Sequence, residues 1–264
     1  MNRLRGALAV LLLLAPAAVE ARPLRVLSLD QCADQYVLAL APEADLALSS
    51  RADDPDSWMR QEARGRSQVR PTLEAAIGFQ PDVVVRYWGG EPRLLAALEK
   101  RGTRVLNIDD ATDMAGVREN LRSVSQGLGQ ETRGGALIAH MNRRLAQAAG
   151  GGREREAVYV TPGGYTTGSG SLIDSILKAA GFRNGMTGPG YQPLGIETIA
   201  LSPPALFVRG FFQQWRADWR GPGRHPVVTR AAKGRTVADL PASTLSCPAW
   251  FSADAALLLA DAAR

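Results

Sequence analysis

The sequence predicts an α/β protein with two parallel-sheet lobes, a single long connector helix and a ligand cleft between the lobes. Three observations lead to this prediction. Short apolar runs typical of buried strands alternate with helical segments, one stretch of sequence occurs twice, and a long amphipathic helix separates the two copies. The predicted boundaries are an N-terminal lobe at 22–129, the connector at 130–150 and a C-terminal lobe at 151–264.

The duplicated stretch covers residues 73–88 and 196–211. Each copy reads as a short helix opened by a glutamate, a proline that ends it, and an apolar strand followed by arginine. The ungapped matches are Leu73-Glu74 with Ile196-Glu197, Pro81 with Pro204, and Val85-Arg86 with Val208-Arg209. A repeat seen only twice indicates two related lobes rather than a solenoid, which needs at least three units. A chance match of a common helix–proline–strand pattern is the alternative.

The first 21 residues are typical of a secretory signal peptide. Arg3 and Arg5 precede a short apolar run at 6–15, and Val19 and Ala21 supply small residues before a cleavage site. The apolar run is too short to span a bilayer stably. No cysteine directly follows it, so a lipid anchor is not predicted. We therefore expect an exported protein of the periplasm, cleaved near Ala21.

Strands and helices alternate along the N-terminal lobe. In chain order, the predicted elements are strand Leu24–Ser28, a helix from Asp30 to Pro42, strand Asp45–Ser49, a polar loop at 50–70, the first copy of the repeat, helix Pro92–Arg101, strand Thr103–Ile108 and a helix from Asp113 to Gly129. Glycine follows two of these helices, at Gly102 and Gly129, as it often does at helix ends.

The connector is predicted between Glu131 and the glycines at 150–152. Its apolar face is formed by Leu137, Ile138, Met141, Leu145 and Ala148. A helix of this length reaches about 30 Å at 1.5 Å per residue. It is therefore long enough to join two lobes.

The α/β alternation resumes in the C-terminal lobe. The predicted elements are strand Glu156–Thr161, a glycine-rich loop at 162–170, helix Ser171–Ala180, a loop at 183–193, the second copy of the repeat, an aromatic stretch at 211–219, a helix at 226–232, strand Arg235–Ala238 and a helix at 252–263.

Composition argues against several classes of function. The net charge is +5, but the arginines are scattered and no basic run of five occurs, so no nucleic-acid partner is predicted. The two histidines, His140 and His225, are far apart, and clustered metal ligands are missing. The Gly168–Ser171 loop lacks both the nucleophile-elbow and P-loop patterns. No catalytic residue, resident metal or cofactor is predicted.

A binding site is better supported, because ligands of open parallel sheets lie beyond the carboxyl ends of the strands. The residues that follow the predicted strands are aromatic, arginine and small polar groups, which suit a bulky ligand with acidic or carbonyl oxygens. The candidate ligand-binding residues from these positions are Arg51, Arg86, Tyr87, Trp88, Tyr165, Thr166, Arg209 and Phe211.

The two cysteines, Cys32 and Cys247, are candidates for a disulfide in an oxidising compartment. Two separate thiols are the alternative, because sequence alone does not bring the residues together.

The chain resembles the periplasmic binding proteins of ABC importers for cobalamin and ferric siderophores. The resemblance covers nearly all of the chain after residue 21. Its most specific parts are Arg25–Leu29, Leu73-Glu74 with Gln80–Val84, Tyr165–Gly168 leading into the helix, and Ile196-Glu197 before Ser202-Pro203. The resemblance implies that Glu74 and Glu197, one per lobe, dock onto arginines of a dimeric membrane permease. It also implies that Trp88 and Trp250 line the cleft.

Within this class we expect a monomer that carries a small-molecule metal chelate. A ferric siderophore is preferred, because Arg51, Arg86 and Arg209 suit an anionic chelate. Cobalamin is the alternative, for which an aromatic cleft is sufficient. An exported enzyme that uses Asp and Ser remains a different class. Direct binding of iron or heme through Tyr87, Tyr165 or Tyr191 is disfavoured, because no second ligand is evident.

Overall fold

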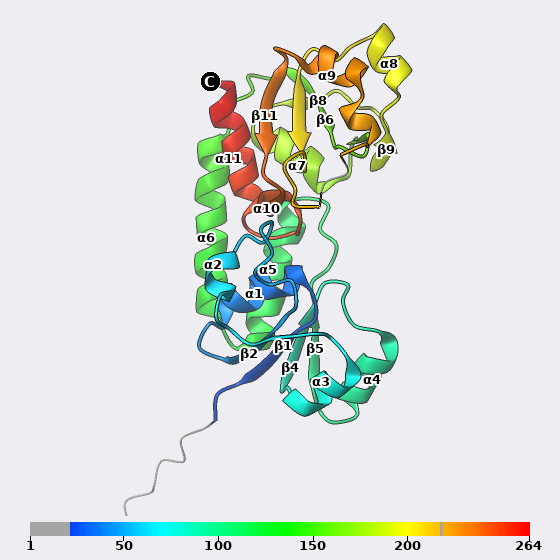
Figure 1. Cartoon of the computed structure of the whole chain (residues 1–264). Coiled ribbons are helices and arrows are strands. Elements are labelled where there is room, and N and C mark those ends of the chain that lie inside the picture. Colours follow the sequence, from blue (N-terminus) through cyan, green and yellow to red (C-terminus); the bar gives the residue numbers. More distant parts are fainter. Residues whose placement is uncertain (1–21, 217–218) are drawn as a thin grey trace, which may run out of the picture.

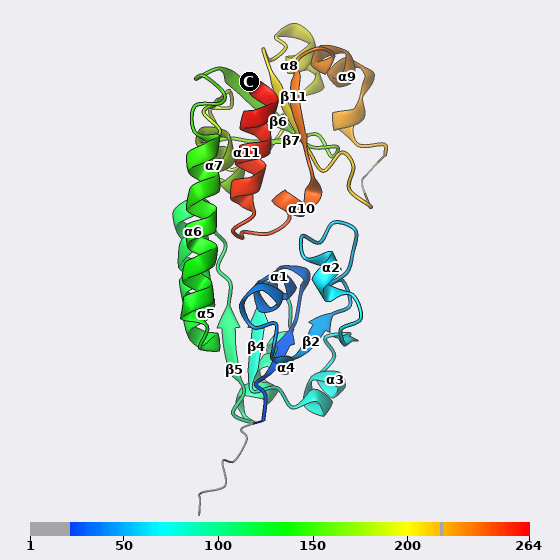
Figure 2. The same ribbon diagram turned by 90° about the vertical axis from the view of Figure 1, so that its left-hand side faces the viewer.

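The computed structural model describes residues 22–216 and 219–264. The predicted signal peptide lies outside the described residues. Two α/β lobes lie one above the other, and a long helix runs along one side of both (Figures 1 and 2). The predicted fold class is confirmed.

The N-terminal lobe has a five-stranded parallel sheet in the order β3-β2-β1-β4-β5. Its strands are β1 (Arg25–Ser28), β2 (Asp45–Ser49), β3 (Gln68–Val69), β4 (Val83–Arg86) and β5 (Arg104–Asn107). Its helices are α1 (Gln31–Leu40), α2 (Arg60–Ala63), α3 (Leu73–Phe79), α4 (Pro92–Glu99) and α5 (Met114–Leu128). The apolar runs at β1 and β4 are buried because the two strands are central in the sheet.

The C-terminal lobe has a four-stranded parallel sheet in the order β11-β10-β6-β8. Its strands are β6 (Glu156–Val160), β8 (Arg183–Asn184), β10 (Phe207–Gly210) and β11 (Thr236–Leu240). Its helices are α7 (Leu172–Ala179), α8 (Ile196–Leu201), the 3-10 turn η1 (Pro222–Arg224), α9 (Pro226–Ala232), α10 (Ala242–Leu245) and α11 (Ser252–Ala263). In both lobes the repeated strand pairs with the first strand of its own sheet, β4 with β1 and β10 with β6.

Four short strands lie where loops are predicted, and two of them, β3 and β8, belong to the parallel sheets. Tyr165–Thr167 forms β7, which pairs antiparallel with β9 (Tyr191–Pro193). The neighbouring glycines and prolines suggest only turns in the sequence, because three-residue strands give too short a pattern to recognise.

The connector is α6 (Glu131–Ala148), which packs against α5 of the N-terminal lobe and α11 of the C-terminal lobe. Met141 and Ala148 on its apolar face are fully buried. Arg144 of α6 forms an ion pair with Asp254 of α11, with Nε 2.6 Å from Oδ1. The helix therefore contacts both lobes over most of its length.

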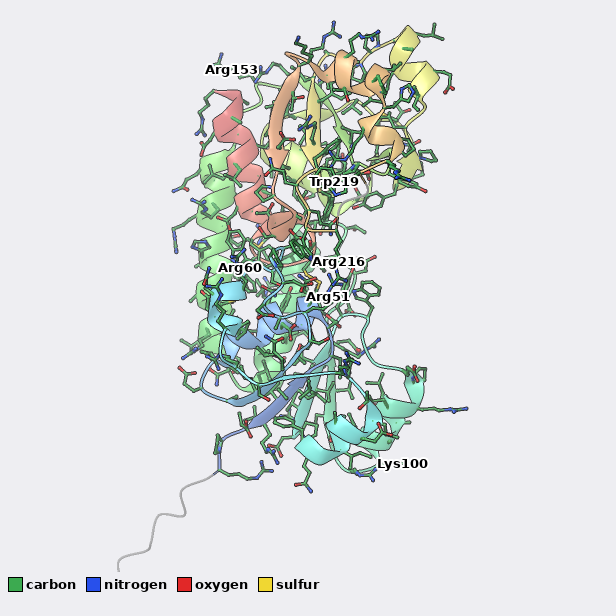
Figure 3. All side chains as sticks on the ribbon, in the orientation of Figure 1. Arg51, Arg60, Lys100, Arg153, Arg216 and Trp219 are labelled. Atoms are coloured by element: carbon green, nitrogen blue, oxygen red, sulfur yellow. A yellow bond between two sulfur atoms is a disulfide. The ribbon has the colours of Figure 1, made fainter. Side chains whose placement is uncertain are left out.

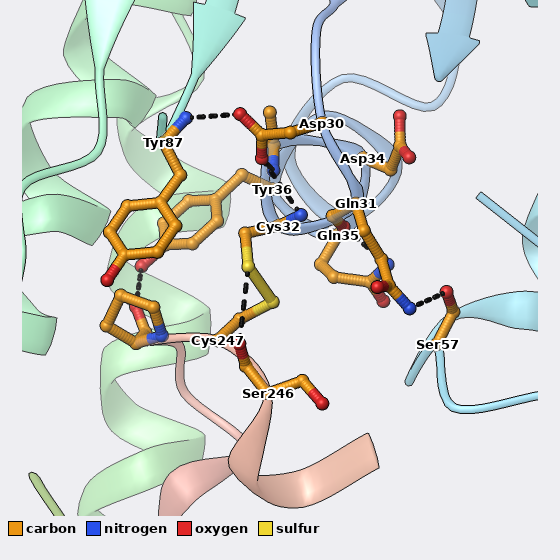
Figure 4. Close-up of a disulfide and its surroundings, with 12 residues drawn as sticks. Asp30, Gln31, Cys32, Asp34, Gln35, Tyr36, Ser57, Tyr87, Ser246 and Cys247 are labelled. Atoms are coloured by element: carbon orange, nitrogen blue, oxygen red, sulfur yellow. Dashed lines mark hydrogen bonds between the residues drawn. A yellow bond between two sulfur atoms is a disulfide. The ribbon is translucent and has the colours of Figure 1, made fainter. Parts of the chain in front are cut away.

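A second connection, which we call the waist, is formed by residues 246–251 packed against α1. Cys32 of α1 is joined to Cys247 by a disulfide (Figure 4). The Tyr36 hydroxyl donates to the Pro248 carbonyl at 2.6 Å, and the ring of Tyr36 packs edge-on against Trp250, with centroids 5.8 Å apart. One hydrophobic core thus continues from α1 through the waist into α11.

Asp34 gives the fold a pH dependence. Its carboxylate is fully buried and accepts hydrogen bonds from the backbone N–H and hydroxyl of Ser49 at 2.8 and 2.5 Å. Burial raises the pKa of this carboxyl to about 6, although the Ser49 hydrogen bonds oppose the shift. Between pH 4 and 6 the unfolded chain loses this proton more readily than the folded protein. Protonated Asp34 therefore favours the folded state at low pH, and this contribution to the free energy of unfolding is lost as the pH rises through the pKa of Asp34.

We expect Asp34→Asn to remove the fall in unfolding free energy that ionisation of Asp34 causes as the pH rises. Relative to wild type, the variant should gain about 3 kcal/mol in free energy of unfolding between pH 4 and 7.5, measured by urea titration at each pH. Asp261→Asn, at an exposed carboxyl of α11, is the control and should show no such gain. An Asp34→Asn difference that stays constant with pH would contradict the assignment.

Candidate functional site

A cleft lies between the two lobes at the carboxyl ends of their strands. One hollow of about 550 Å³, which we call the main hollow because both lobes line it, lies between them. Its lining residues are Gln31, Arg51, Tyr87 and 110–112 from the N-terminal lobe, 170–173, Gly190, Tyr191, Phe211 and Gln214 from the C-terminal lobe, and 245–248 between them. Two adjoining hollows of about 710 and 290 Å³ extend it along the N-terminal lobe. Ser246 lines all three, so we treat them as one cleft.

The loop after β4 supplies the aromatic wall of the N-terminal lobe. Tyr87 lines the main hollow, and Trp88, with 75 % of its surface exposed, lines both adjoining hollows. The Tyr87 hydroxyl donates to Asp110 Oδ1 at 2.7 Å. Burial and then this hydrogen bond raise the pKa of Tyr87, so its phenol stays protonated at neutral pH. The wall thus offers two ring faces and no phenolate.

Tyr191 and Phe211 face the same cleft from the C-terminal lobe. Tyr191 belongs to β9 and is 64 % exposed. Phe211 follows β10 and has a φ of 64°, a left-handed conformation that is uncommon for a bulky residue. Such conformations are often found at functional sites. Aromatic residues therefore lie on both sides of the cleft.

The three predicted arginines do not converge. Arg51 lies at the level where the lobes meet (Figure 3), lines the cleft and pairs with Asp54 at 2.8 Å. Arg86 lines the hollow beside Trp88 and donates to the Gly89 carbonyl and to Asn107 Oδ1. Arg209 is in register with Asp239 of β11 and forms a two-bond ion pair with it. Its guanidinium also stacks on Phe212. Arg209 is not among the residues that line the three hollows, so the structure gives no support to its predicted contact with the ligand.

Three more predicted positions do not line the cleft. Thr166 is fully buried, whereas its neighbour Tyr165 in β7 is exposed. Tyr165 is 51 % exposed but is not among the residues that line the three hollows. Trp250 is 5 % exposed and packs between Tyr36 and Phe251 in the waist. In this structure Trp250 is a core residue and does not line the three hollows, so its predicted ligand role has no support from the geometry.

Glu74 and Glu197 are both exposed in the first turn of their helices. Their helices, α3 and α8, lie at opposite ends of the molecule and on the side away from α6 (Figures 1 and 2). Carboxylates in the first turn are favoured by the helix dipole. The two glutamates thus mark comparable places on the two lobes.

Several cleft residues were not predicted, chiefly Asp110, Gln214, Ser246 and the start of α7 at 171–173. Asp110 lies just beyond β5, so applying the strand-end rule to every strand would have found it. Ser246 belongs to the waist, whose position depends on the disulfide and has no local sequence signal.

Within residues 22–216 and 219–264, no group of three or more His, Cys, Asp or Glu side chains is placed to hold a metal ion. In the same residues no helix is long and apolar enough to cross a membrane.

Known proteins similar to this chain are binding proteins. No family model matches it. Two curated proteins from strains of Halobacterium salinarum, each described as a cobalamin-binding protein, are 26% identical over 203 residues. The match covers 73% of this chain and 55% of each relative, so this chain corresponds to about half of their length.

Solved structures share the fold over most of the chain. A periplasmic heme-binding protein of Vibrio cholerae has a TM-score of 0.72 at 16% identity, covering 90% of this chain and 98% of the other. A possible iron-binding periplasmic solute-binding protein of Staphylococcus epidermidis has a TM-score of 0.71 at 15% identity, and the match covers 92% of this chain and 99% of the other. The periplasmic vitamin B12-binding protein of Vibrio cholerae has a TM-score of 0.64 at 18% identity, and the match covers 91% of this chain and 96% of the other. The chain has the fold of the periplasmic substrate-binding proteins of ABC importers, and the resemblance predicted from its motifs is confirmed.

Proposed function

We propose that this protein is the periplasmic substrate-binding component of an ABC importer and that its ligand is a corrinoid such as cobalamin. The observation that carries the proposal is the pair of aromatic walls, Tyr87-Trp88 on one lobe and Tyr191 with Phe211 on the other, facing one cleft. Large flat or bulky ligands bind to such clefts mainly through ring contacts and buried apolar area.

The charges of the cleft favour a corrinoid over a ferric siderophore. Arg51 and Arg86 are already engaged with protein oxygens, and Arg209 is held by Asp239. Asp110 adds a carboxylate to the main hollow. An anionic chelate would have to compete with these partners, whereas a ligand with a nearly neutral ring system would not. The cobalamin-binding relatives support the same choice.

Heme is the second candidate, supported by the exposed phenol of Tyr191 in the cleft and by the heme-binding proteins of the same fold. Tyr87 is a poor iron ligand, because its hydroxyl is committed to Asp110. A heme complex would have a strong Soret absorption band, which separates the two candidates.

The proposed partner is a dimeric permease that receives the ligand, with Glu74 and Glu197 as the docking carboxylates, one per lobe. Their exposure and their positions at the two ends of the molecule support this role.

Ligand choice can be tested by tryptophan fluorescence. We expect cyanocobalamin to quench the protein with micromolar or lower Kd, because Trp88 lies in the cleft. Trp88→Ala should weaken binding about 10-fold or more, since ring contacts at the centre of a site carry much of the affinity. Trp219→Ala is the matched control, because Trp219 is 72 % exposed and stacks on Arg224 but is not among the residues that line the three hollows.

The other outcomes distinguish the alternatives. Quenching by a ferric siderophore alone would replace the corrinoid with that ligand, and a Soret band with hemin alone would replace it with heme. No binding of any of the three would contradict the proposed function.

A further inference from the structure

Asp30 lies at the junction of β1, α1 and the aromatic wall, and its carboxylate accepts five backbone N–H groups. Oδ1 caps α1 by accepting from Cys32 at 3.0 Å and Ala33 at 2.9 Å. Oδ2 accepts from Tyr87, Trp88 and Gly89 at 2.7, 3.2 and 3.0 Å. Figure 4 shows the carboxylate between Cys32 and Tyr87. One side chain therefore joins a helix start to a loop 57 residues away in sequence.

The loop itself is held close against Asp30. A Cβ on Gly89 would lie 2.4 Å from the Leu29 carbonyl oxygen, so only glycine allows this approach. Arg86 closes the loop from the other side by donating to the Gly89 carbonyl. The positions of the Tyr87 and Trp88 rings thus depend on the three hydrogen bonds that Asp30 Oδ2 accepts from the backbone of the loop.

The same helix start is also covalently fixed to the waist. Cys32, whose N–H is bound by Asp30, is joined to Cys247, with Cα atoms 5.4 Å apart. Its sulfur lies 3.5 Å from the Ser246 carbonyl oxygen. Asp30 therefore connects the aromatic wall of the cleft to the segment that lines all three hollows.

The chemistry of the site requires a carboxylate. Both oxygens of an aspartate accept hydrogen bonds, and N–H groups face both of them here. An asparagine would turn an NH₂ group toward at least one of the two sets of N–H donors. A glutamate is one methylene longer and would push the loop away from Leu29.

We propose that Asp30 is the positioning residue of the ligand-binding wall: it holds Tyr87, Trp88 and Gly89 in place through their backbone N–H groups and links them to the disulfide-bonded start of α1. The proposal rests on the proposed function only in taking this wall as part of the ligand site. Asp30 also lines the adjoining hollow of about 290 Å³, but its carboxylate oxygens are occupied by N–H donors, so it acts on the ligand through the loop.

The test compares Asp30→Asn with Asp113→Asn in the full-length protein. Asp113 is the N-cap of α5, where its Oδ1 accepts from the Gly116 N–H at 2.8 Å, so its side chain holds its own helix rather than the aromatic loop. Both variants lose a helix cap, so both should lower the Tm. Only Asp30→Asn should speed amide hydrogen exchange at Tyr87–Gly89 by 10-fold or more and weaken cyanocobalamin binding by 10-fold or more.

A second variant covers the case in which Asp30→Asn fails to fold. Gly89→Ala keeps the Asp30 side chain but forces the loop away from Leu29, and its Cβ would also lie 3.0 Å from Asp30 Oδ2. This variant should weaken cyanocobalamin binding to a similar degree. If wild type binds and Asp30→Asn or Gly89→Ala binds equally well, the positioning role is wrong. If exchange at Tyr87–Gly89 accelerates in Asp30→Asn but wild type binds no cyanocobalamin, the proposed ligand is wrong and the positioning role stands.

Discussion

We expect the replacement of both Glu74 and Glu197 with alanine to abolish uptake of the ligand into cells while leaving the ligand Kd of the isolated protein unchanged. The reason is geometric, since both carboxylates are exposed on helices at the two ends of the molecule and neither lines the cleft. Truncating one partner of an intermolecular charge pair costs about 2–5 kcal/mol when the pair is buried in the complex. If both glutamates form such pairs, their loss should lower permease affinity by several orders of magnitude. Uptake of labelled ligand and fluorescence titration measure the two quantities.

Glu131→Ala provides the matched control for this experiment. Glu131 is also an exposed glutamate in the first turn of a helix, but α6 lies on the opposite side of the molecule from α3 and α8. Its removal should leave uptake at the wild-type level. Loss of ligand affinity in the double variant, or full uptake by it, would disprove the docking role.

Removing the disulfide should cause the largest change in stability. The bond joins residues 215 apart in sequence, so it restricts a very long loop of the unfolded chain. For such a loop we expect the double variant Cys32→Ala with Cys247→Ala to lose about 3–5 kcal/mol of unfolding free energy. Alanine suits both sites, because Cys32 and Cys247 are 5 % and 3 % exposed. Urea unfolding under oxidising conditions gives the difference.

Reduction of the wild-type protein serves as the check. A reducing agent should lower the stability of wild type toward that of the double variant and leave the variant unaffected. Equal stabilities of oxidised wild type and double variant would mean that the bond does not form in solution.

The fold was predictable because its signals are local or repeated. The duplicated stretch predicted β4 and β10, which take equivalent central places in their sheets, and the apolar face of Leu137–Ala148 predicted α6. Strand-end positions also brought Arg51, Tyr87, Trp88 and Phe211 to the cleft. Parallel strands place their carboxyl ends at one edge, so this inference needs no knowledge of side-chain packing.

The predictions without support from the structure concern residues whose surroundings are set by distant partners. Arg209 was assigned to the ligand, but its register with Asp239 depends on strand pairing that the sequence does not reveal. Trp250 follows a segment without clear periodicity, so its burial against Tyr36 could not be read from its neighbours. Asp30 was recognised only as the start of a helix, because the loop it holds lies far along the chain.

The continuous core of the waist limits how far the lobes can part by thermal motion. Separating them would wet Tyr36, Trp250 and Phe251, three large side chains that are now almost completely sheltered. At about 1.5–3 kcal/mol for each such side chain, the cost is roughly 5–9 kcal/mol. A population changes tenfold for each change of about 1.4 kcal/mol. Fewer than about one molecule in several thousand therefore has its lobes separated at any moment. The free energy needed to separate the lobes therefore has to come from a binding partner or another source outside the chain.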